Sequence, residues 1–399
     1  MNLAFECINS AVNRLTCVRR NRHCLTRLAV FLFGFGTIAV PIIATNAQGV
    51  DAYIDDTHGI LQTSIGIQIV GTDFGYDSYL FRATVDGERL ALDTRNAKFI
   101  VANSKNPNPT VDLDCDTGSL PINRYPFKVY DADITWVVGG LMNGEIPQES
   151  DWEPTYCNSA GVIFKNAASS AVDGLRITSA WDAIRAGPDS SGLTIRNNWI
   201  SNVRDDVLEN DDFLSVTFED NLVDGTFQGI SVHSGGDIST DTGAKIHVYG
   251  NVIRIREYLY KGRQQYGALF KNEPSSPASI IRNTVVAVDH QGGRTFSGYW
   301  ERSWSKIEDC SNNLFLWLSD EPISSSVSSP PSCFRVLTGE EARAEWALAK
   351  KNWIDCHPKV SRTPADPVSN PEQCVKNRFG GYSRYDTVAP LPPTLLPQN

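Results

Sequence analysis

The segment LTIRNNWI at residues 193–200 decides the fold, because variants of it recur along the chain. The other copies are VTFEDNLV at 216–223, IHVYGNVI at 246–253, SIIRNTVV at 279–286 and DCSNNLFL at 309–316. Laid over one another, they align Asn198, Asn221, Asn251, Asn283 and Asn313, which are 23, 30, 32 and 30 residues apart. An earlier copy, LRITSAW at 175–181, has Ala180 in place of the Asn. Self-similarity at such a period predicts a solenoid.

Each copy alternates like a half-buried strand. In the earliest copy Leu175 and Ile177 would face inward, and Arg176 and Thr178 outward. A single coil cannot bury its apolar side, whereas stacked coils can, with parallel strands about 4.8 Å apart. The Asn would tolerate a left-handed bend and bond the Asn of the next coil. A β-propeller is disfavoured because its blades are longer, and a leucine-rich repeat because the dense Leu pattern is missing.

These coils resemble those of the right-handed parallel β-helix superfamily, which includes pectate lyases, polygalacturonases, alginate lyases and mannuronan epimerases. The resemblance covers residues 134–318, about half of the chain. It implies an all-β, right-handed parallel β-helix solenoid and a polysaccharide substrate. No complete signature of any one enzyme family is present, so the resemblance leaves the reaction open.

The chain divides into four predicted parts. Residues 1–47 form a signal peptide, with a front of five Arg, an uncharged stretch and small residues before Gln48. Residues 48–133 supply N-terminal strands that cap the solenoid, and 134–320 form its coils. Residues 321–399 form a Cys-containing tail with a short helix, which a capping box at Thr338 begins and which runs to about Trp353.

Composition and cysteine usage indicate export. Removing residues 1–47, with five Arg and one Glu, changes the net charge from −10 to −14, so nucleic acid is not an expected partner. Six of the nine cysteines remain, enough for three disulfides in an oxidising compartment. We therefore expect a secreted or periplasmic protein, a monomer without stable membrane association after cleavage. The alternative is a protein anchored by an uncleaved N-terminal segment.

Residues at one position of successive coils line up in a solenoid, which predicts the site. The segments 182–185, 206–209, 228–231 and 267–270 follow the Asn strands of four coils. Their alignment stacks Ile184, Leu208, Ile230 and Leu269 inward, and Arg185, Glu209 and Ser231 outward. Asp211, His233 and Asn272 would share the next level, with Lys271 beside them. The run RDDVLENDD at 204–212 adds five carboxylates, and close like charges need a cation or a basic side chain.

Two reactions fit this cleft. In a lyase, Lys271 or His233 would remove the C5 proton of a uronate, while Arg185 or a Ca²⁺ ion neutralises its carboxylate. The Ca²⁺ ligands would be Asp206, Glu209 and Asp211. In a hydrolase, two of these three carboxyl groups would act as acid and base.

The leading prediction is a lyase that cleaves an acidic polysaccharide by β-elimination, because lyases are frequent in the superfamily. A glycoside hydrolase and a non-catalytic polysaccharide-binding or surface protein are the alternatives. Arg204, Trp181 and Tyr266 are predicted to bind the substrate, and Tyr260 is among further aromatic residues that could stack on sugar rings.

Overall fold

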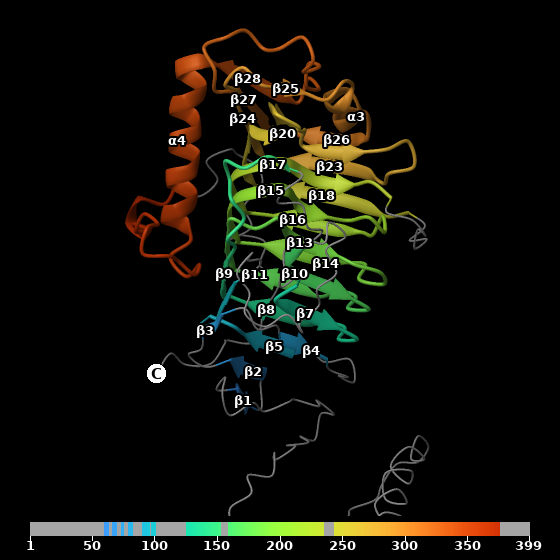
Figure 1. Cartoon of the computed structure of the whole chain (residues 1–399), viewed down its shortest axis with the longest axis vertical. Coiled ribbons are helices and arrows are strands. Elements are labelled where there is room, and N and C mark those ends of the chain that lie inside the picture. Colours follow the sequence, from blue (N-terminus) through green and yellow to red (C-terminus); the bar gives the residue numbers. More distant parts are fainter. Residues whose placement is uncertain are drawn as a thin grey trace, which may run out of the picture. The chain divides into compact units, whose positions relative to one another are not determined.

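The structure, a computed structural model, describes residues 60–63, 66–69, 73–75, 79–82, 90–95, 97–100, 125–152, 159–234 and 243–375. The predicted signal peptide, Cys115 and Cys157 lie outside these residues. Almost every strand pairing is parallel; within the described ranges the antiparallel exceptions are the pairs β1–β2 and β20–β21. The chain is an all-β solenoid of stacked coils (Figure 1), as the sequence predicts.

Three walls form the solenoid. The first wall is a ten-stranded sheet. Its strands, in order, are β1 Ile60–Thr63, β2 Gly66–Ile69, β5 Leu90–Asp93, β8 Thr135–Val138, β11 Ala171–Asp173, β14 Leu193–Arg196, β16 Val216–Glu219, β18 Lys245–Tyr249, β23 Ala278–Arg282 and β26 Ile307–Ser311. Because β2, β5 and β8 pair in parallel, stacking begins before Ile134, where the sequence placed its start.

The second and third walls belong to one fifteen-stranded sheet. The second wall contains, in order, β3 Asp73–Gly75, β6 Lys98–Ile100, β9 Leu141–Asn143, β12 Arg176–Thr178, β15 Trp199–Glu209, β17 Leu222–Val232, β19 Val252–Arg256, β24 Val285–Asp289, β27 Asn313–Trp317 and β28 Phe334–Thr338. The third contains β4 Tyr79–Phe81, β7 Phe127–Tyr130, β10 Ala160–Lys165, β13 Asp182–Ala186 and β22 Phe270–Asn272. The long strands β15 and β17 take part in both walls, which joins them into one sheet.

Among the described residues, a small third sheet and two helices lie outside the walls. The sheet holds β20 Tyr258–Tyr260, β21 Arg263–Tyr266 and β25 Arg294–Thr295. Helix α3 spans Tyr299–Ser305, α4 spans Gly339–Cys356, and a 3₁₀ turn spans Pro371–Gln373. Helix α4 runs beside the second wall (Figure 1) and shares an apolar cluster with it. It is longer than predicted, and Thr338 is its N-cap without a side-chain capping bond.

The predicted column of stacked Asn side chains is present, but in one coil it contains a different residue from the one predicted. Asn198 donates from Nδ2 to Oδ1 of Asn221 at 2.9 Å, and Asn221 does the same to Asn251 at 3.0 Å. In the next coil Thr284 occupies the position, and its backbone N–H donates to Asn313 Oδ1. Asn283 is instead the residue with left-handed backbone, φ 51°. The left-handed bend and the ladder therefore belong to two consecutive residues, and the alignment of Asn283 with the column was wrong.

The earliest copy is also aligned differently from the prediction. Strand β12 pairs Arg176 with Trp199, which places Leu175, and not Ala180, at the position of Asn198. The backbone N–H of Leu175 donates to Asn198 Oδ1, so an apolar residue ends the ladder. Leu175 and Ile177 are fully buried in the core, as predicted.

Two disulfides staple the C-terminal part, Cys310–Cys333 and Cys356–Cys374. They fit an oxidising compartment outside the cytoplasm. Among the described residues, no helix has both the length and the apolar character needed to cross a membrane.

Candidate functional site

The register of the third wall decides which side chains become neighbours. Arg185 pairs with Glu209, Glu209 with Ser231, and Ser231 with Lys271. The outward column is as predicted for its first three members. In the fourth coil the prediction was wrong by one residue: Phe270, and not Leu269, pairs with Ile230. This shift places Lys271 in the outward column itself.

The same shift changes the next level of the stack. Asn272 pairs with Val232, and not with His233. His233 is matched instead by Glu273, with Nε2 at 3.9 Å from Glu273 Oε2. The His233 side chain is 53% exposed, so it extends from the wall toward solvent.

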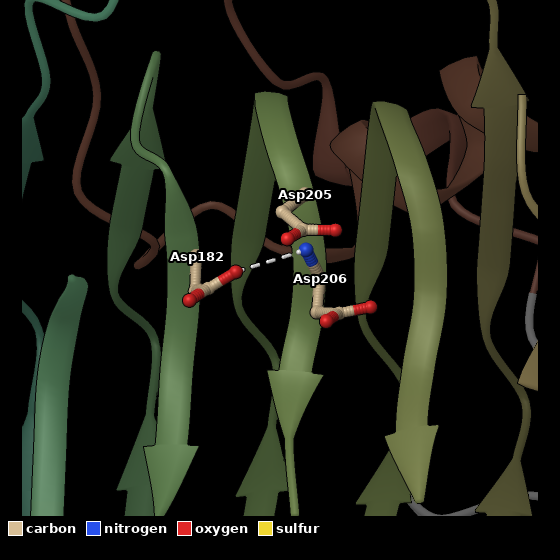
Figure 2. A group of neighbouring side chains, drawn as sticks. All are labelled: Asp182, Asp205 and Asp206. Atoms are coloured by element: carbon tan, nitrogen blue, oxygen red, sulfur yellow. Dashed lines mark hydrogen bonds between the residues drawn. The ribbon is translucent and has the colours of Figure 1, made fainter. Parts of the chain in front are cut away.

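Three aspartates converge where the second and third walls meet. Asp182 begins β13, and Asp205 and Asp206 follow a register shift in β15. This irregularity lets two consecutive side chains of β15 approach the same neighbour. One carboxylate oxygen of each aspartate lies within 4.8 Å of the others. Figure 2 shows the three carboxyl groups gathered on one side of β13 and β15, with the backbone N–H of Asp206 donating to Asp182 Oδ1 at 3.0 Å.

Burial and mutual repulsion perturb these acids. Asp182 and Asp206 are 2% and 1% exposed, and desolvation followed by neighbouring negative charges raises both pKa values well above their ordinary range. Burial also raises the pKa of Asp205 to about 6, although the charge of Lys271 opposes the rise. Such a cluster keeps at least one proton near neutral pH.

Lys271 supplies the cation of this cluster. Its Nζ lies 3.5 Å from Asp206 Oδ2, while Oδ1 of Asp206 is buried without a hydrogen-bond partner among the described residues. The charge of Asp206 raises the pKa of Lys271, so the amine stays protonated. A protonated amine cannot remove a proton, so this position favours Lys271 as a cation over Lys271 as the base of a lyase.

Arg185 is engaged by two carboxylates. Its Nη1 lies 2.5 Å from Glu209 Oε2 and its Nη2 lies 3.1 Å from Asp211 Oδ2. Burial raises the pKa of Glu209 to about 8, against the opposing effect of Arg185. The predicted Ca²⁺ ligands are therefore divided: Glu209 and Asp211 bind Arg185, whereas Asp206 joins Asp182 and Asp205.

The three predicted substrate-binding residues are buried. Arg204, Trp181 and Tyr266 are all 0% exposed, so none offers a surface to a ligand, and the prediction was wrong for each. Arg204 donates from Nη2 to the backbone oxygens of Ser150, at 2.7 Å, and Leu259. Its role is to hold two surface segments against the coil.

A cavity of about 290 Å³ lies next to Lys271, the cation of the acid cluster. Its lining includes three basic side chains, those of Lys271, His233 and Arg302, one acidic side chain, Glu273, and the ring of Tyr299. The guanidinium of Arg302 lies 4.8 Å from the centre of the Tyr299 ring. The cavity thus offers positive charge and hydrogen-bond donors next to the buried carboxyl groups.

Sequence reasoning missed Asp182 and Asp205 as site residues. The signal was available, because the alignment of 182–185 with 206–209 already stacked Asp182 on Asp206. What the sequence did not show is the irregularity in β15 that brings Asp205 to the same point.

Comparisons with known proteins identify the fold and no reaction. Residues 142–253 match the family described as right handed beta helix region. No curated protein and no solved structure matches the chain. The coils that carry Asp182, Asp205 and Asp206 lie within the matched residues, and Lys271 lies beyond them.

Proposed function

We propose that this right-handed β-helix protein is a glycoside hydrolase that uses Asp182, Asp205 and Asp206 to cleave an acidic polysaccharide. One observation carries the proposal: three carboxyl groups with raised pKa values meet within 4.8 Å, beside a single ammonium group. Carboxyl groups in different protonation states at one point are what acid–base hydrolysis of a glycosidic bond needs.

The environments divide the roles. Asp205 is the least buried of the three, and with a pKa of about 6 it is protonated in mildly acidic solution. Asp205 donates this proton to the glycosidic oxygen as the bond to the anomeric carbon breaks. Asp206, whose raised pKa the charge of Lys271 opposes, attacks the anomeric carbon in its ionised form, and water then hydrolyses the glycosyl–enzyme bond while Asp205 takes up the proton of that water. This order suits carboxyl oxygens that lie within 4.8 Å of one another, because an inverting hydrolase needs a wider gap for its water. Asp182 orients Asp206 through the backbone hydrogen bond.

The surroundings favour an acidic sugar. The net charge of −10 would repel a polyanion at a distance, so a local excess of positive charge is required for binding. The cavity beside Lys271 offers two cations, Lys271 and Arg302, against one carboxylate, Glu273, although Lys271 also faces Asp206. A uronate carboxylate in this cavity would keep the sugar ring next to Asp205 and Asp206.

β-Elimination is the second candidate, and a Ca²⁺ ion would be its requirement. Oxygen atoms of Asp182, Asp205 and Asp206 lie close enough to share a cation, and Ca²⁺ takes carboxylate ligands. Such an ion would supply charge neutralisation for a uronate. For a lyase, Lys271 is held protonated beside Asp206, so His233, which lines the cavity, would be the base.

The products separate these candidates. The full chain is incubated with polygalacturonate, alginate and neutral xylan, each with Ca²⁺ and with EDTA, and an Asp205→Asn protein purified in the same way is the control. We expect new reducing ends without unsaturated products from an acidic polymer, unaffected by EDTA. Unsaturated products that need Ca²⁺ would establish the lyase instead. No product from any polymer would contradict both reactions and leave the polysaccharide-binding alternative.

A further inference from the structure

Four aromatic rings form a continuous row on the surface next to the acids. We propose that this row, Trp152, Tyr260, Phe296 and Tyr299, is a stacking platform for the sugar rings of an acidic polysaccharide. The proposal rests on the proposed function for its substrate class. It adds a binding surface that lies outside the three walls.

The rings are in contact and accessible. The ring centres of Trp152 and Tyr260 lie 5.0 Å apart, those of Tyr260 and Phe296 5.4 Å, and those of Phe296 and Tyr299 4.7 Å. All four side chains are half-buried. Phe227, which is 3% exposed, packs beneath Trp152, Tyr260 and Phe296. The ring planes meet at 65°, 88° and 38°, so each ring presents its own partly exposed surface on which a sugar ring can pack.

The platform is fixed by polar bonds beneath it. Both carboxylate oxygens of Asp151, the residue before Trp152, accept backbone N–H groups from Lys261 and Gly262 at 2.6 Å. Arg204 binds the backbone oxygens of Ser150 and Leu259, one residue before Asp151 and one before Tyr260. The strand β20 and the segment that carries Trp152 are thereby held together. Rigid aromatic side chains lose little conformational entropy on binding, which favours affinity.

The row leads to the acid cluster. Tyr299 lines the same cavity as Lys271, whose Nζ lies 3.5 Å from Asp206. At the other side, Trp152 packs against Trp181 with ring centres 4.7 Å apart, and the backbone oxygen of Trp181 accepts the N–H of Asp205. A chain lying on the platform would therefore approach the carboxyl groups at the Tyr299 end of the row.

Charge selects the occupant. The ammonium of Lys261 lies 5.3 Å from the centre of the Tyr260 ring, and the guanidinium of Arg302 lies 4.8 Å from that of Tyr299. Sugar rings present apolar C–H faces to aromatic rings, while their acidic groups extend sideways toward such cations. This combination fits an acidic polysaccharide better than an apolar peptide or a second copy of the chain.

The test measures binding separately from cleavage. Asp205→Asn protein is run by affinity electrophoresis through gels that contain polygalacturonate, alginate or xylan, alone and with Tyr260→Leu or Trp152→Ala. We expect retardation by an acidic polymer, with the apparent Kd raised about three- to tenfold per lost ring. Tyr260→Phe, which keeps the ring, and Tyr249→Ala, a half-buried aromatic residue of the first wall, should bind like the parent. Thermal unfolding of each variant identifies any that fails to fold, and Tyr260→Leu keeps the apolar bulk for that reason.

The outcomes are distinguishable. Retardation unchanged by Tyr260→Leu and Trp152→Ala overturns the platform, and the proposed hydrolase stands if the wild type still releases products. Retardation that depends on the rings, without products from any polymer, supports the platform and overturns the hydrolase. A dimer in sedimentation that Trp152→Ala dissociates would assign the row to a second copy. No retardation by any polymer overturns the platform.

Discussion

The second and third walls of the solenoid both bury acidic side chains, but they differ in the cations that surround these acids. On the second wall, under the C-terminal part, Asp224 lies 2.7 Å from Arg254 and 2.5 Å from Lys350. These cations lower the pKa of Asp224 despite its burial. Arg176 and Asp366 form a similar pair at 2.8 Å, and the pKa of Asp366 is lowered too. Here each acid has at least one cation of its own.

At the acid cluster of the third wall, the buried acids outnumber the nearby cations. Asp206 and Asp205 face the ammonium of Lys271, Asp205 also feels the charge of Arg204, and the pKa values of both and of Asp182 are raised. A fold gains nothing from unpaired buried acids, since their desolvation is costly. Paired acids therefore indicate a structural role and crowded acids a functional one.

Replacing the proposed proton donor should give the largest effect. Asp205→Asn removes the acid and keeps the shape of the side chain, so product release should fall by about 10²- to 10⁴-fold. The denaturation midpoint at pH 7 should not decrease, because the fold loses a charge that it disfavours. An Asp205→Asn protein that keeps the wild-type rate would remove the assigned role.

Replacing a paired acid should have the opposite consequence. Asp224→Asn leaves Lys350 without this partner, while Arg254 keeps Asp289 at 2.9 Å. The free energy of unfolding should fall by about 2 kcal/mol, less than for full burial because the Lys350 side chain is 30% exposed. Urea unfolding measures the loss, and the rate per folded molecule should stay at the wild-type value. A severe loss of rate would mean that the second wall also serves the reaction.

Removing the shared cation should move the pH profile. Lys271 lowers the pKa of Asp205, so Lys271→Met should raise it further. The rate falls as Asp205 loses its proton, and this alkaline limb should therefore move upward by about one pH unit, together with a lower maximal rate. Initial rates between pH 4 and pH 9 provide the profile. An alkaline limb that keeps its position would show that Lys271 does not act on the proton donor.

The smallest expected effect is on the pH dependence of the free energy of unfolding. The folded pKa of Asp205, about 6, exceeds its ordinary value, so its contribution is complete below about pH 4 and is lost as pH rises through 6. For Asp224 the folded pKa is lowered, so its contribution is present above about pH 4 and is lost as pH falls. Asp205→Asn should flatten the decline between about pH 4 and pH 6, and Asp224→Asn should flatten the slope only on the acidic side. Chemical unfolding at each pH checks both slopes.

The sequence predicted that the coils stack, but it did not predict the register of every coil. The Asn column follows from spacing, because a buried amide ladder needs Asn at one position of successive coils. Each bend contains two consecutive residues, such as Asn197-Asn198 and Asn283-Thr284, and only the second residue bonds the next coil. The alignment misplaced Asn283 because the Asn of that pair is the first residue. Sequence alone does not tell the left-handed residue from the ladder residue.

The candidate site was predicted in part for a related reason. Arg185 and Glu209 lie on consecutive short coils, and the sequence spacing of these coils fixes the register between them. Lys271 follows a longer excursion of the chain through β18–β21, and nothing in the sequence fixes the register on its return. Trp181, Arg204 and Tyr266 have residue types suited to sugar binding, but only the packing of the small outer sheet shows that they are buried.

We propose that the crowded acids on the third wall act in catalysis, while the paired acids on the second wall stabilise the fold. The most direct test measures reducing-end release and urea unfolding on the same preparations of the wild type, Asp205→Asn and Asp224→Asn. We predict a crossed result: Asp205→Asn folded and inactive, Asp224→Asn less stable and active. Activity that falls in proportion to stability in both variants would contradict the claim.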